Sequence, residues 1–443
     1  MIFTSLLPSV GFLTLALPSI QAQSDPFIPF DEFLKGVQDA TYAQWKGTAI
    51  ESPAAFDEVR AHILSMYDGI GKISNTFVLD AKYTDCVDIL KQPTVRLLGI
   101  DTIDIPPSNN SHPELSQGDG HVLNYADSPL KLGFKDRFGN LISCPDNTIP
   151  FDRLTLQRLT RFPNLKAFFG KPVGLPSIPD ASVEQHDQQV LARRIAEPTL
   201  HAYAFQRVNN FGGNSWLSLH NPVGDFSASQ QWYVGGTGID TQTVEGGWLV
   251  WDNRFATKKA VLFIFSDTTA PCWNLDCAAF VQINNHWLLG GSFSHYSVSG
   301  GEQWGFGMQW KLYRGNWWLF LKGAGSYEAV GYYPTRVFNG GKLAKIARLV
   351  QYGGVVNRFD PSHNWPQMGS GAFPWAGWTK AAFQNSIFYI PKDESGGVGV
   401  WTGLTTDVQG SKKCWDIAYT PSTRGGSWGS YIFFGGPGGR VCT

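Results

Sequence analysis

Glutamates are scarce in the second half of this 443-residue chain, and that scarcity makes each of them informative. Residues 200–443 contain Glu245, Glu302, Glu328 and Glu394 and no other glutamate. Glu394 lies in a polar Lys-Asp-Glu-Ser loop, where a carboxylate is solvated. Glu245 lies in the apolar run TVEGGWLV, where burying a carboxylate is costly unless it is hydrogen-bonded or functional. An apolar environment also favours the protonated form of a carboxyl, which suits general acid–base catalysis.

Patterns for other enzyme classes are incomplete. GGSWG at residues 425–429 matches the GxSxG of serine hydrolases, but in α/β-hydrolases a histidine follows that serine, and the last histidine here is His363. The chain has no P-loop and no complete GxGxxG, so nucleotide binding has no support. It has no CxxC or HExxH, and its nine histidines are scattered. We therefore expect neither a metal nor a cofactor.

The first 22 residues, MIFTSLLPSVGFLTLALPSIQA, are apolar and end in a small residue, Ala22, as signal peptides do. This stretch is too short and too proline-rich to span a bilayer. We therefore expect residues 1–22 to be removed and the protein to be secreted, extracellular and free of the membrane. In a secreted chain, Asn109-Asn110-Ser111 is an acceptor sequence for N-glycosylation at Asn109.

Six cysteines in a secreted chain indicate disulfide bonds. Their spacing groups them as Cys272 with Cys277, Cys414 with Cys442, and Cys86 with Cys144. Each half of the chain can therefore pair its cysteines internally, although other connectivities stay formally possible.

The elements that must position these residues differ between the two halves. Near the start, Ser52 can cap a helix whose first residue is Pro53, and apolar residues recur at helical spacing up to Gly69. A weaker helical pattern covers residues 152–160, and residues 76–79 and 94–98 have the composition of short strands. After residue 200, short runs rich in Val, Ile, Phe, Tyr and Trp alternate with Gly-rich turns, which is typical of an antiparallel β-sandwich.

Composition and charge divide the chain at the same place. Residues 200–443 hold 16 of the 17 tryptophans and carry 18 Lys+Arg against 13 Asp+Glu, whereas residues 1–199 carry 17 against 23. The overall net charge of -1 argues against nucleic-acid binding, which needs a basic surface. The opposite charges predict that the halves attract at neutral pH, and that protonating carboxylates in acid weakens the contact.

A series of short motifs resembles the neprosin family of secreted glutamic peptidases, and the motifs occur in the family's order. They are DFSASQQW at residues 225–232, EGGW at 245–248, CWNLDC at 272–277, GNWWL at 315–319, GYYP at 331–334, QYGG at 351–354, QMGSG at 367–371 and YIFFGGPG at 431–438. The resemblance extends from about residue 200 to the end of the chain. DRFGNLISC at residues 136–144 more faintly resembles the family's activation peptide.

This resemblance implies a β-sandwich peptidase that is made as a zymogen, acts in acid and cleaves on the carboxyl side of proline, with two glutamates in its cleft. Two carboxyl groups near one water explain acid action, because like charges held close share one proton. Glu245 matches the first glutamate of the family. The second belongs to a Gly-Gly-Glu, but this sequence reads Gly353-Gly354-Val355. A valine side chain performs no proton chemistry.

Two interpretations of this valine keep the peptidase active. In the first, Glu302 or Glu328 supplies the second carboxyl from another strand, although a salt bridge or a solvated strand edge also explains either residue. In the second, Glu245 works with an amide such as Gln351 or Asn357, because another group of glutamic peptidases pairs Glu with Gln. Both amides are also predicted to bind substrate.

The third interpretation is that Val355 marks the loss of catalysis. The protein would then be a secreted binding protein for a proline-rich or carbohydrate polymer, which would stack in a tryptophan-rich groove. Trp248, beside Glu245 in sequence, is the predicted aromatic contact to substrate. Trp365, Trp375 and Trp378, around a proline-bounded loop, are further candidates for such a groove.

The sequence thus predicts a signal peptide over residues 1–22, a mixed α/β propeptide-like region over 23–190, and an all-β catalytic domain, an antiparallel β-sandwich, over 199–443. The predicted function is a secreted, acid-acting glutamic endopeptidase that cleaves after proline. Its partners would be a proline-containing protein or peptide and its own propeptide, with no nucleic acid and no membrane. The junction between the parts is expected within residues 184–198, where Arg193-Arg194 could admit a dibasic-cutting protease.

Overall fold

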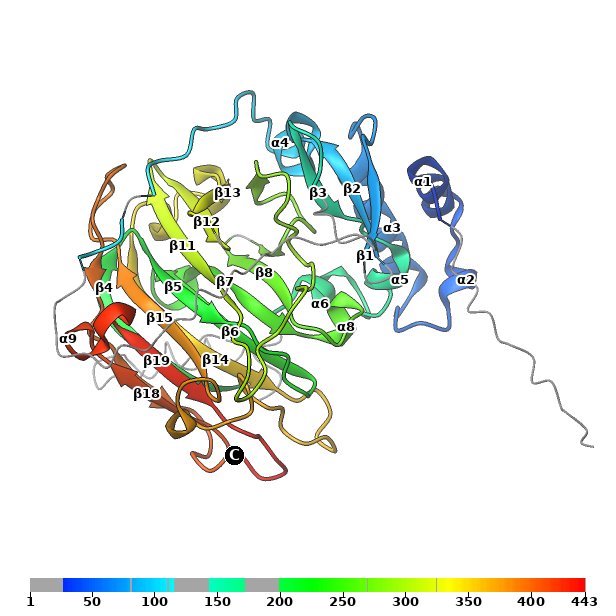
Figure 1. Ribbon diagram of the computed structural model, residues 1–443. Helices are drawn as coiled ribbons and strands as arrows, with labels where there is room; N and C mark the ends of the chain where they lie inside the picture. The colour runs from blue at the N-terminus through cyan, green and yellow to red at the C-terminus, as the bar shows by residue number, and fades with distance from the viewer. Residues whose placement is uncertain are drawn as a thin grey trace, which may run out of the picture.

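The computed structural model describes residues 27–79, 82–109, 111–114, 143–171, 199–268, 270–323 and 325–442 (Figure 1). The predicted signal peptide and the predicted junction, with Arg193-Arg194, lie outside the described residues. Among the described residues, no helix is long and apolar enough to cross a membrane. Residues 27–171 are called the N-terminal part below, and residues 199–442 the sandwich.

The N-terminal part combines short helices with a small antiparallel sheet of order β1-β2-β3. Its helices are α1 (Phe30–Asp39), α2 (Tyr42–Trp45), α3 (Pro53–Tyr67), the 3-10 helix η1 (Ile89–Lys91), α4 (Pro93–Leu97), α5 (Leu156–Leu159) and α6 (Leu165–Phe169). Its strands are β1 (Thr76–Leu79), β2 (Lys82–Asp88) and β3 (Thr148–Asp152). α3 begins as predicted, because the Ser52 side chain accepts a hydrogen bond from the amide of Ala55 at 3.1 Å.

Two sequence predictions in this part are wrong. The strand expected over residues 94–98 is instead helix α4 (Pro93–Leu97), because Pro93 occupies the first helical position and favours a helical start. The helix expected over residues 152–160 is shorter. Asp152 ends strand β3, which pairs with β2, and Thr155 caps α5 by accepting from the amide of Arg158.

Sixteen strands make up the sandwich. They are β4 (Leu200–Asn210), β5 (Gly212–Ser218), β6 (Phe226–Gly235), β7 (Gln242–Val250), β8 (Val261–Asp267), β9 (Pro271–Trp273), β10 (Val281–Gln282), β11 (Gly305–Tyr313), β12 (Asn316–Lys322), β13 (Glu328–Tyr333), β14 (Ala347–Asn357), β15 (Ala382–Tyr389), β16 (Val400–Trp401), β17 (Thr405–Val408), β18 (Asp416–Thr420) and β19 (Tyr431–Gly435). Short helices connect them: η2 (Gly238–Asp240), α8 (Asp252–Phe255), η3 (Thr335–Phe338), η4 (Lys342–Ala344), η5 (Pro374–Ala376), α9 (Ser422–Gly425) and η6 (Gly426–Trp428).

The strands form two antiparallel sheets that pack face to face. The seven-stranded sheet has the order β17-β4-β14-β6-β7-β8-β9, and the nine-stranded sheet has the order β10-β13-β12-β11-β5-β15-β19-β18, with β16 paired to β15. Side chains join the layers: Gln231 of β6 donates to Ser215 of β5 at 2.7 Å, and Gln384 of β15 donates to Ser229 of β6 at 3.0 Å. The predicted antiparallel β-sandwich is confirmed.

Alternation along the strands gives the seven-stranded sheet two distinct faces. On β6, Ser229 and Gln231 point into the space between the sheets, as their bonds show. Residues 228, 230 and 232 therefore lie on the outer face of this sheet. The N-terminal part reaches that side of the sandwich, because the indole of Trp273 on β9 donates to the carbonyl of Phe169 at the end of α6, at 3.1 Å.

A second segment of the N-terminal part runs along the nine-stranded sheet (Figure 1). Asn316 of β12 donates to the Asp104 carboxylate at 2.8 Å. The Lys311 ammonium on β11 donates to the carbonyl of Ser108 at 2.9 Å, and the Trp401 indole on β16 donates to the carbonyl of Glu114 at 2.8 Å. The N-terminal part therefore contacts both sheets of the sandwich.

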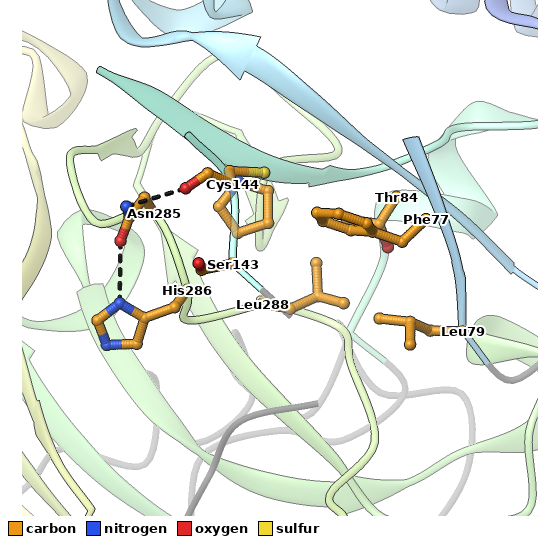
Figure 2. Close-up of a pocket in the computed structure, with 9 residues that line it drawn as sticks. Phe77, Leu79, Thr84, Ser143, Cys144, Asn285, His286 and Leu288 are labelled. Carbon is orange, nitrogen blue, oxygen red and sulfur yellow. Dashed lines mark hydrogen bonds between the residues drawn. The ribbon is translucent and has the colours of Figure 1, made fainter. Parts of the chain in front are cut away.

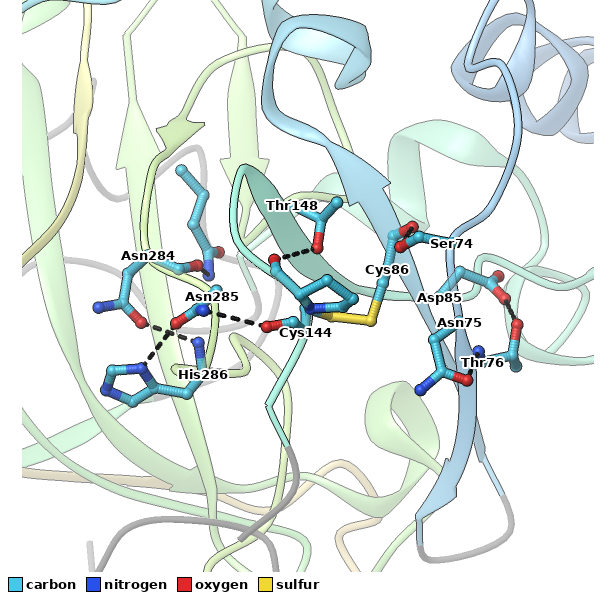
Figure 3. Close-up of a disulfide and its surroundings, with 12 residues drawn as sticks. Ser74, Asn75, Thr76, Asp85, Cys86, Cys144, Thr148, Asn284, Asn285 and His286 are labelled. Carbon is cyan, nitrogen blue, oxygen red and sulfur yellow. Dashed lines mark hydrogen bonds between the residues drawn. A yellow bond between two sulfur atoms is a disulfide. The ribbon is translucent and has the colours of Figure 1, made fainter.

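The three disulfides are those that the spacing of the cysteines predicted: Cys86–Cys144, Cys272–Cys277 and Cys414–Cys442. Figure 3 shows the first, which joins β2 to the segment before β3. The backbone of Cys144 exchanges two hydrogen bonds with Asn285 of the sandwich, at 2.8 and 3.0 Å. Every disulfide lies within one part, so only the main chain links the N-terminal part covalently to the sandwich.

Candidate active site

Glu245 lies in the middle of β7, on the outer face of the seven-stranded sheet. Its neighbours across the sheet are Trp232 on β6 and Phe265 on β8. It is 1% exposed, although it is a carboxylate. Such burial needs hydrogen-bond partners or charge compensation, and the structure provides both.

Three side chains bind the two carboxylate oxygens of Glu245. Gln230 of β6 donates its amide to Oε2 at 2.6 Å, and Thr243 donates its hydroxyl to Oε1 at 2.8 Å. The Lys171 ammonium forms an ion pair with Oε2. Sequence reasoning missed all three residues. Alternation along the strand could have indicated Thr243, which lies two residues before Glu245 on β7. The proximity of Gln230 and Lys171 depends on strand pairing and on the docking of the N-terminal part.

A row of side chains crosses the sheet through this carboxyl. The register aligns Glu245 with Trp232, and Trp232 with Gln351 on β14. In the next row, Gln230 is aligned with Gly247 on one side and Gly353 on the other. Two glycines leave the Gln230 amide without side-chain neighbours in its own row, next to Glu245.

Glycine is required at position 353. Its φ is +150°, and a Cβ there would lie 2.4 Å from the carbonyl oxygen of Ala202 on β4. Any other residue would push the two strands apart. The absence of a side chain beside Gln230 at this position is therefore fixed by the backbone.

Several polar atoms in these two rows are buried and have no hydrogen-bond partner among the residues that the structure describes. They are both amide atoms of Gln351, Oε1 of Gln230 and the indole nitrogen of Trp232. Each buried polar group without a hydrogen-bond partner costs about 1–3 kcal/mol of folding free energy. Such groups are few in native proteins, so each needs a structural or functional explanation. A bound peptide group, with one acceptor and one donor, matches them in chemical type.

Val355 lies on the same face of β14 as Gln351, two residues beyond Gly353. It is fully buried and aligned with Ala228 on β6 and with His201 on β4. No carboxyl group therefore stands where the family resemblance predicts the second glutamate. His201, which was not predicted, is bonded through Nδ1 to the side chain of Gln409 at 2.6 Å.

The structure does not bring the other two predicted glutamates to Glu245. Glu328 begins β13 in the nine-stranded sheet, where it is exposed and bonds to Nε2 of His286 at 2.7 Å and to the indole of Trp287 at 3.0 Å. Glu302 lies exposed in the loop before β11. Both match the alternative of a surface pair or a solvated residue.

The predicted amides and tryptophans divide between the two faces. Gln351 and Asn357 share the outer face of β14 by alternation. Trp248 is three residues from Glu245 and thus lies on the opposite face of β7, where its indole donates to the carbonyl of Ser218 at 2.8 Å. Its prediction as a substrate contact is corrected accordingly, since Trp248 belongs to the packing between the sheets. The aromatic residues beside Glu245 are Trp232 and Phe265.

The pocket in Figure 2 lacks this combination of groups. It lies between β1, β3 and the loop at residues 284–288, and its lining mixes apolar side chains with Thr84, Ser143, Asn285 and His286 but contains no carboxylate. Among the described ranges, no group of three or more His, Cys, Asp or Glu could hold a metal ion.

The fold and the site define a β-sandwich protein with a buried, hydrogen-bonded glutamate on the outer face of one sheet. Residues 223–437, which contain β6 to β19 and Glu245, match the model of the Neprosin family. This match, with a buried glutamate inside the matched region, points to a peptidase of the glutamic type that acts on protein or peptide.

Two solved structures of scytalido-glutamic peptidase are also similar. One contains a peptide-based transition state analog, and the other a transition state analog inhibitor. Both are 8% identical to this chain, cover 54% of it and are themselves covered over 98%, with TM-scores of 0.31 and 0.30.

Proposed function

We propose that the protein is a secreted, acid-acting glutamic endopeptidase that is made as a zymogen and cleaves after proline. The observation that carries this proposal is the burial of Glu245 on a sheet face where three further polar groups have unused hydrogen-bond capacity. A carboxylate with a purely structural role would need only the side chains that already bind it. The three further groups with unused hydrogen-bond capacity fit a site that a bound peptide substrate completes.

In the proposed reaction, Glu245 is the only carboxyl that handles protons. Its carboxylate takes a proton from water as the water oxygen bonds to the scissile carbonyl carbon, and the carbonyl π electrons move to oxygen. Amide N–H groups of Gln351 and Gln230 are the donors available to that oxyanion. The intermediate then expels the amine while Glu245 returns the proton to its nitrogen, which leaves a carboxylic acid, an amine and the original carboxylate.

Aromatic side chains beside Glu245 support the proposed preference for proline. Trp232 and Phe265 flank the carboxyl on either side, and the ring of Phe265 packs on Trp273 with centroids 4.6 Å apart. Flat aromatic faces make large contacts with a rigid pyrrolidine ring at low entropic cost. The family resemblance supplies the position of the cut, on the carboxyl side of proline.

The contact between the two parts supports a zymogen. Arg158 of α5 donates to the Asp276 carboxylate at 2.6 Å, and Arg254 of α8 donates to the same oxygen at 2.7 Å. Burial lowers the pKa of Arg254 to about 9, because desolvation outweighs the charge of Asp276. Since no disulfide joins the parts, one cut between residues 171 and 199 would leave two chains held by such contacts alone.

Secretion is supported by the cysteines as well as by the apolar N-terminus. All six are paired within the structure, and such disulfides persist in oxidising compartments. N-glycosylation at Asn109 stays a prediction. The amide of this side chain is partly buried and donates to the carbonyl of Tyr327 at 2.8 Å.

The proposal is tested by mapping the cuts that the acid-treated protein makes in a proline-containing peptide. We expect products that end in proline at acid pH, within the range of about 2 to 6, identified by mass spectrometry. N-terminal sequencing of the treated protein checks the zymogen, with a new N-terminus expected within residues 184–198. An uncut peptide at every acid pH would remove the peptidase claim, and an intact chain would remove the zymogen claim.

The buried Val355 favours one alternative, a secreted binding protein in which catalysis is lost. The tryptophans suggested for such a groove do not converge on Glu245. Trp365 packs on Trp415, while Trp375 stacks on Phe373 and is 71% exposed. This alternative would be favoured if the same peptide bound to the protein without being cleaved. Tryptophan fluorescence would measure that binding.

A further inference from the structure

Lys171 reaches Glu245 from outside the sandwich. It follows α6 and is the last described residue before residue 199. Its ammonium pairs with Oε2 of Glu245, and the two side chains are 10% and 1% exposed. A lysine from the acidic N-terminal part therefore covers the carboxyl that the proposed mechanism needs.

The end of α6 is anchored in a way that directs Lys171 to this place. The carbonyl of Phe168 accepts a hydrogen bond from the Arg254 guanidinium, which lies 4.2 Å from the centroid of the Phe168 ring. The carbonyl of Phe169 accepts from the indole of Trp273. Both anchors lie within three residues of Lys171. They distinguish it from a surface lysine that meets an acid by chance.

The wall of the site also fits an ammonium. The Lys171 nitrogen lies 5.1 Å from the centroid of the Phe265 ring, within the range of a cation–π contact. Phe265 is the neighbour of Glu245 on β8. The charge of the lysine is thus compensated by a carboxylate and stabilised by an aromatic face, both belonging to the sandwich.

With this lysine in place, both acceptor positions of Oε2 are occupied, so no water can bind this oxygen. Oε2 accepts from Lys171 and Gln230, and Oε1 accepts from Thr243. A general base must accept a proton from a water within hydrogen-bond reach. The ammonium is a donor without an acceptor, so it cannot replace that water.

We propose that Lys171 is a built-in inhibitor of the Glu245 site, and that withdrawal of its side chain exposes the site. This inference rests on the proposed function, because it takes Glu245 as the catalytic carboxyl. No rearrangement of the sheets is required, since Gln230 and Thr243 hold Glu245 from β6 and β7 without the lysine. Release of one side chain is enough to open one acceptor position on Oε2.

The first test measures the contact without using activity. The full chain is treated with an amine-acetylating reagent, and the rate at each lysine is followed by mass spectrometry. Lys166, exposed on α6, is the internal standard. We expect Lys171 to react at least about tenfold more slowly than Lys166, and about tenfold faster in Glu245→Gln than in the wild type. Equal rates at the two lysines in the wild-type chain would overturn the inference.

The second test measures latency with matched variants, Lys171→Met and Lys166→Met. In the unprocessed chain we expect Lys171→Met to cleave a proline-containing peptide at least about tenfold faster than the wild type, and Lys166→Met to be as latent as the wild type. After processing and removal of the N-terminal part, all three should cleave equally, because the part that is removed carries both positions. The inference would be overturned if the processed enzyme were active while the unprocessed Lys171→Met chain cleaved no faster than the unprocessed wild type.

The two tests separate this inference from the proposed function. If no processed form cleaves the peptide, the proposed function fails, while the acetylation rates still decide whether Lys171 covers Glu245. If the processed forms are active and Lys171 is unprotected, only the inhibitory role is lost.

Discussion

The chemistry of Glu245 depends on neighbours from its own strand, β7, and from the strands β6 and β14. Gln230 and Thr243 donate to the two carboxylate oxygens, at 2.6 and 2.8 Å, so the carboxylate has a defined orientation on the outer face of the sheet. Gln351 lies in the same cross-strand row, and neither of its amide atoms has a partner. A residue that is costly to bury and unused within the fold is a candidate for contact with the reacting peptide.

Replacing Gln351 with leucine should therefore raise stability and lower activity. Leucine removes two buried orphan atoms at similar volume, which should increase the free energy of unfolding by about 1 kcal/mol. If the amide stabilises the oxyanion, kcat should fall by about 100-fold with little change in KM. Denaturant titration and steady-state kinetics on the processed enzyme give the two values. A variant that loses stability and keeps its kcat would contradict this role.

Gln231→Leu is the matched control, because it changes the same side chain on the inward face of β6. Its amide donates to the Ser215 hydroxyl and to the carbonyl of Met308, at 2.7 and 2.9 Å. We expect this variant to lose about 1 kcal/mol or more of stability and to keep its kcat. Opposite effects of the two substitutions on stability and on kcat would distinguish a residue of the site from a residue of the core.

At the scale of elements, strand alternation decides which predicted residues can meet. Glu245 was predictable because a lone carboxylate in an apolar run is unusual. Trp248 was wrongly grouped with it, since positions three apart on a strand face opposite ways. The strand-rich second half and the start of α3 followed from composition and capping, whereas α4 was hidden by a strand-like composition after Pro93.

Contacts between elements distant in the sequence could not be predicted. Gln230 meets Glu245 only because β6 and β7 pair in one register, and a shift of one residue would move it to the other face. Lys171 meets Glu245 only because α6 docks on β9. The cysteine pairs were predictable because their spacing keeps each pair within one part.

The link between α5 and the sandwich gives a prediction at this scale. Arg158→Met removes a buried cation that bonds to Asp276 at 2.6 Å and contacts Asp152 at 3.4 Å. Loss of one partner from a buried ionic network should destabilise the full chain by about 3 kcal/mol. The processed sandwich lacks this residue and should be unaffected. Thermal unfolding of both forms measures the difference, and an unchanged full-chain midpoint would show that α5 does not hold the parts together.

At the scale of the whole molecule, the N-terminal part contacts the sandwich on two sides. Residues 104–114 bond to β11, β12 and β16 of the nine-stranded sheet, while α5 and α6 contact the side of the seven-stranded sheet that carries Glu245. The net acidic charge of residues 1–199 and the net basic charge of residues 200–443 add a long-range attraction. Both sets of contacts would have to yield for the mature enzyme to separate.

His62 of α3 makes this association dependent on pH. Burial lowers its pKa, since desolvation outweighs the hydrogen bond to the carbonyl of Asp276, at 2.9 Å, and the Asp276 charge. A released histidine titrates near its ordinary value of about 6.5. The contact is therefore strongest above that pH and weakens as the pH falls below it, because the released form binds the proton more readily.

The substitution His62→Gln should make the association of the two parts less dependent on pH between about pH 6.5 and 5. Most carboxylates titrate below this range. The measurement is the dissociation constant of the two chains after processing, taken over that range. A wild-type constant that does not rise as the pH falls, or a variant with the same slope, would contradict the role of His62.

The central claim is that Glu245 is the catalytic carboxyl, and its most direct test is the kcat/KM of processed Glu245→Gln on a proline-containing peptide. The control is Glu394→Gln, which changes an exposed loop glutamate. We predict a loss of at least about 1,000-fold for Glu245→Gln, because an amide cannot accept the proton of water, and no change for the control. Cleavage by Glu245→Gln at the wild-type rate would contradict the account.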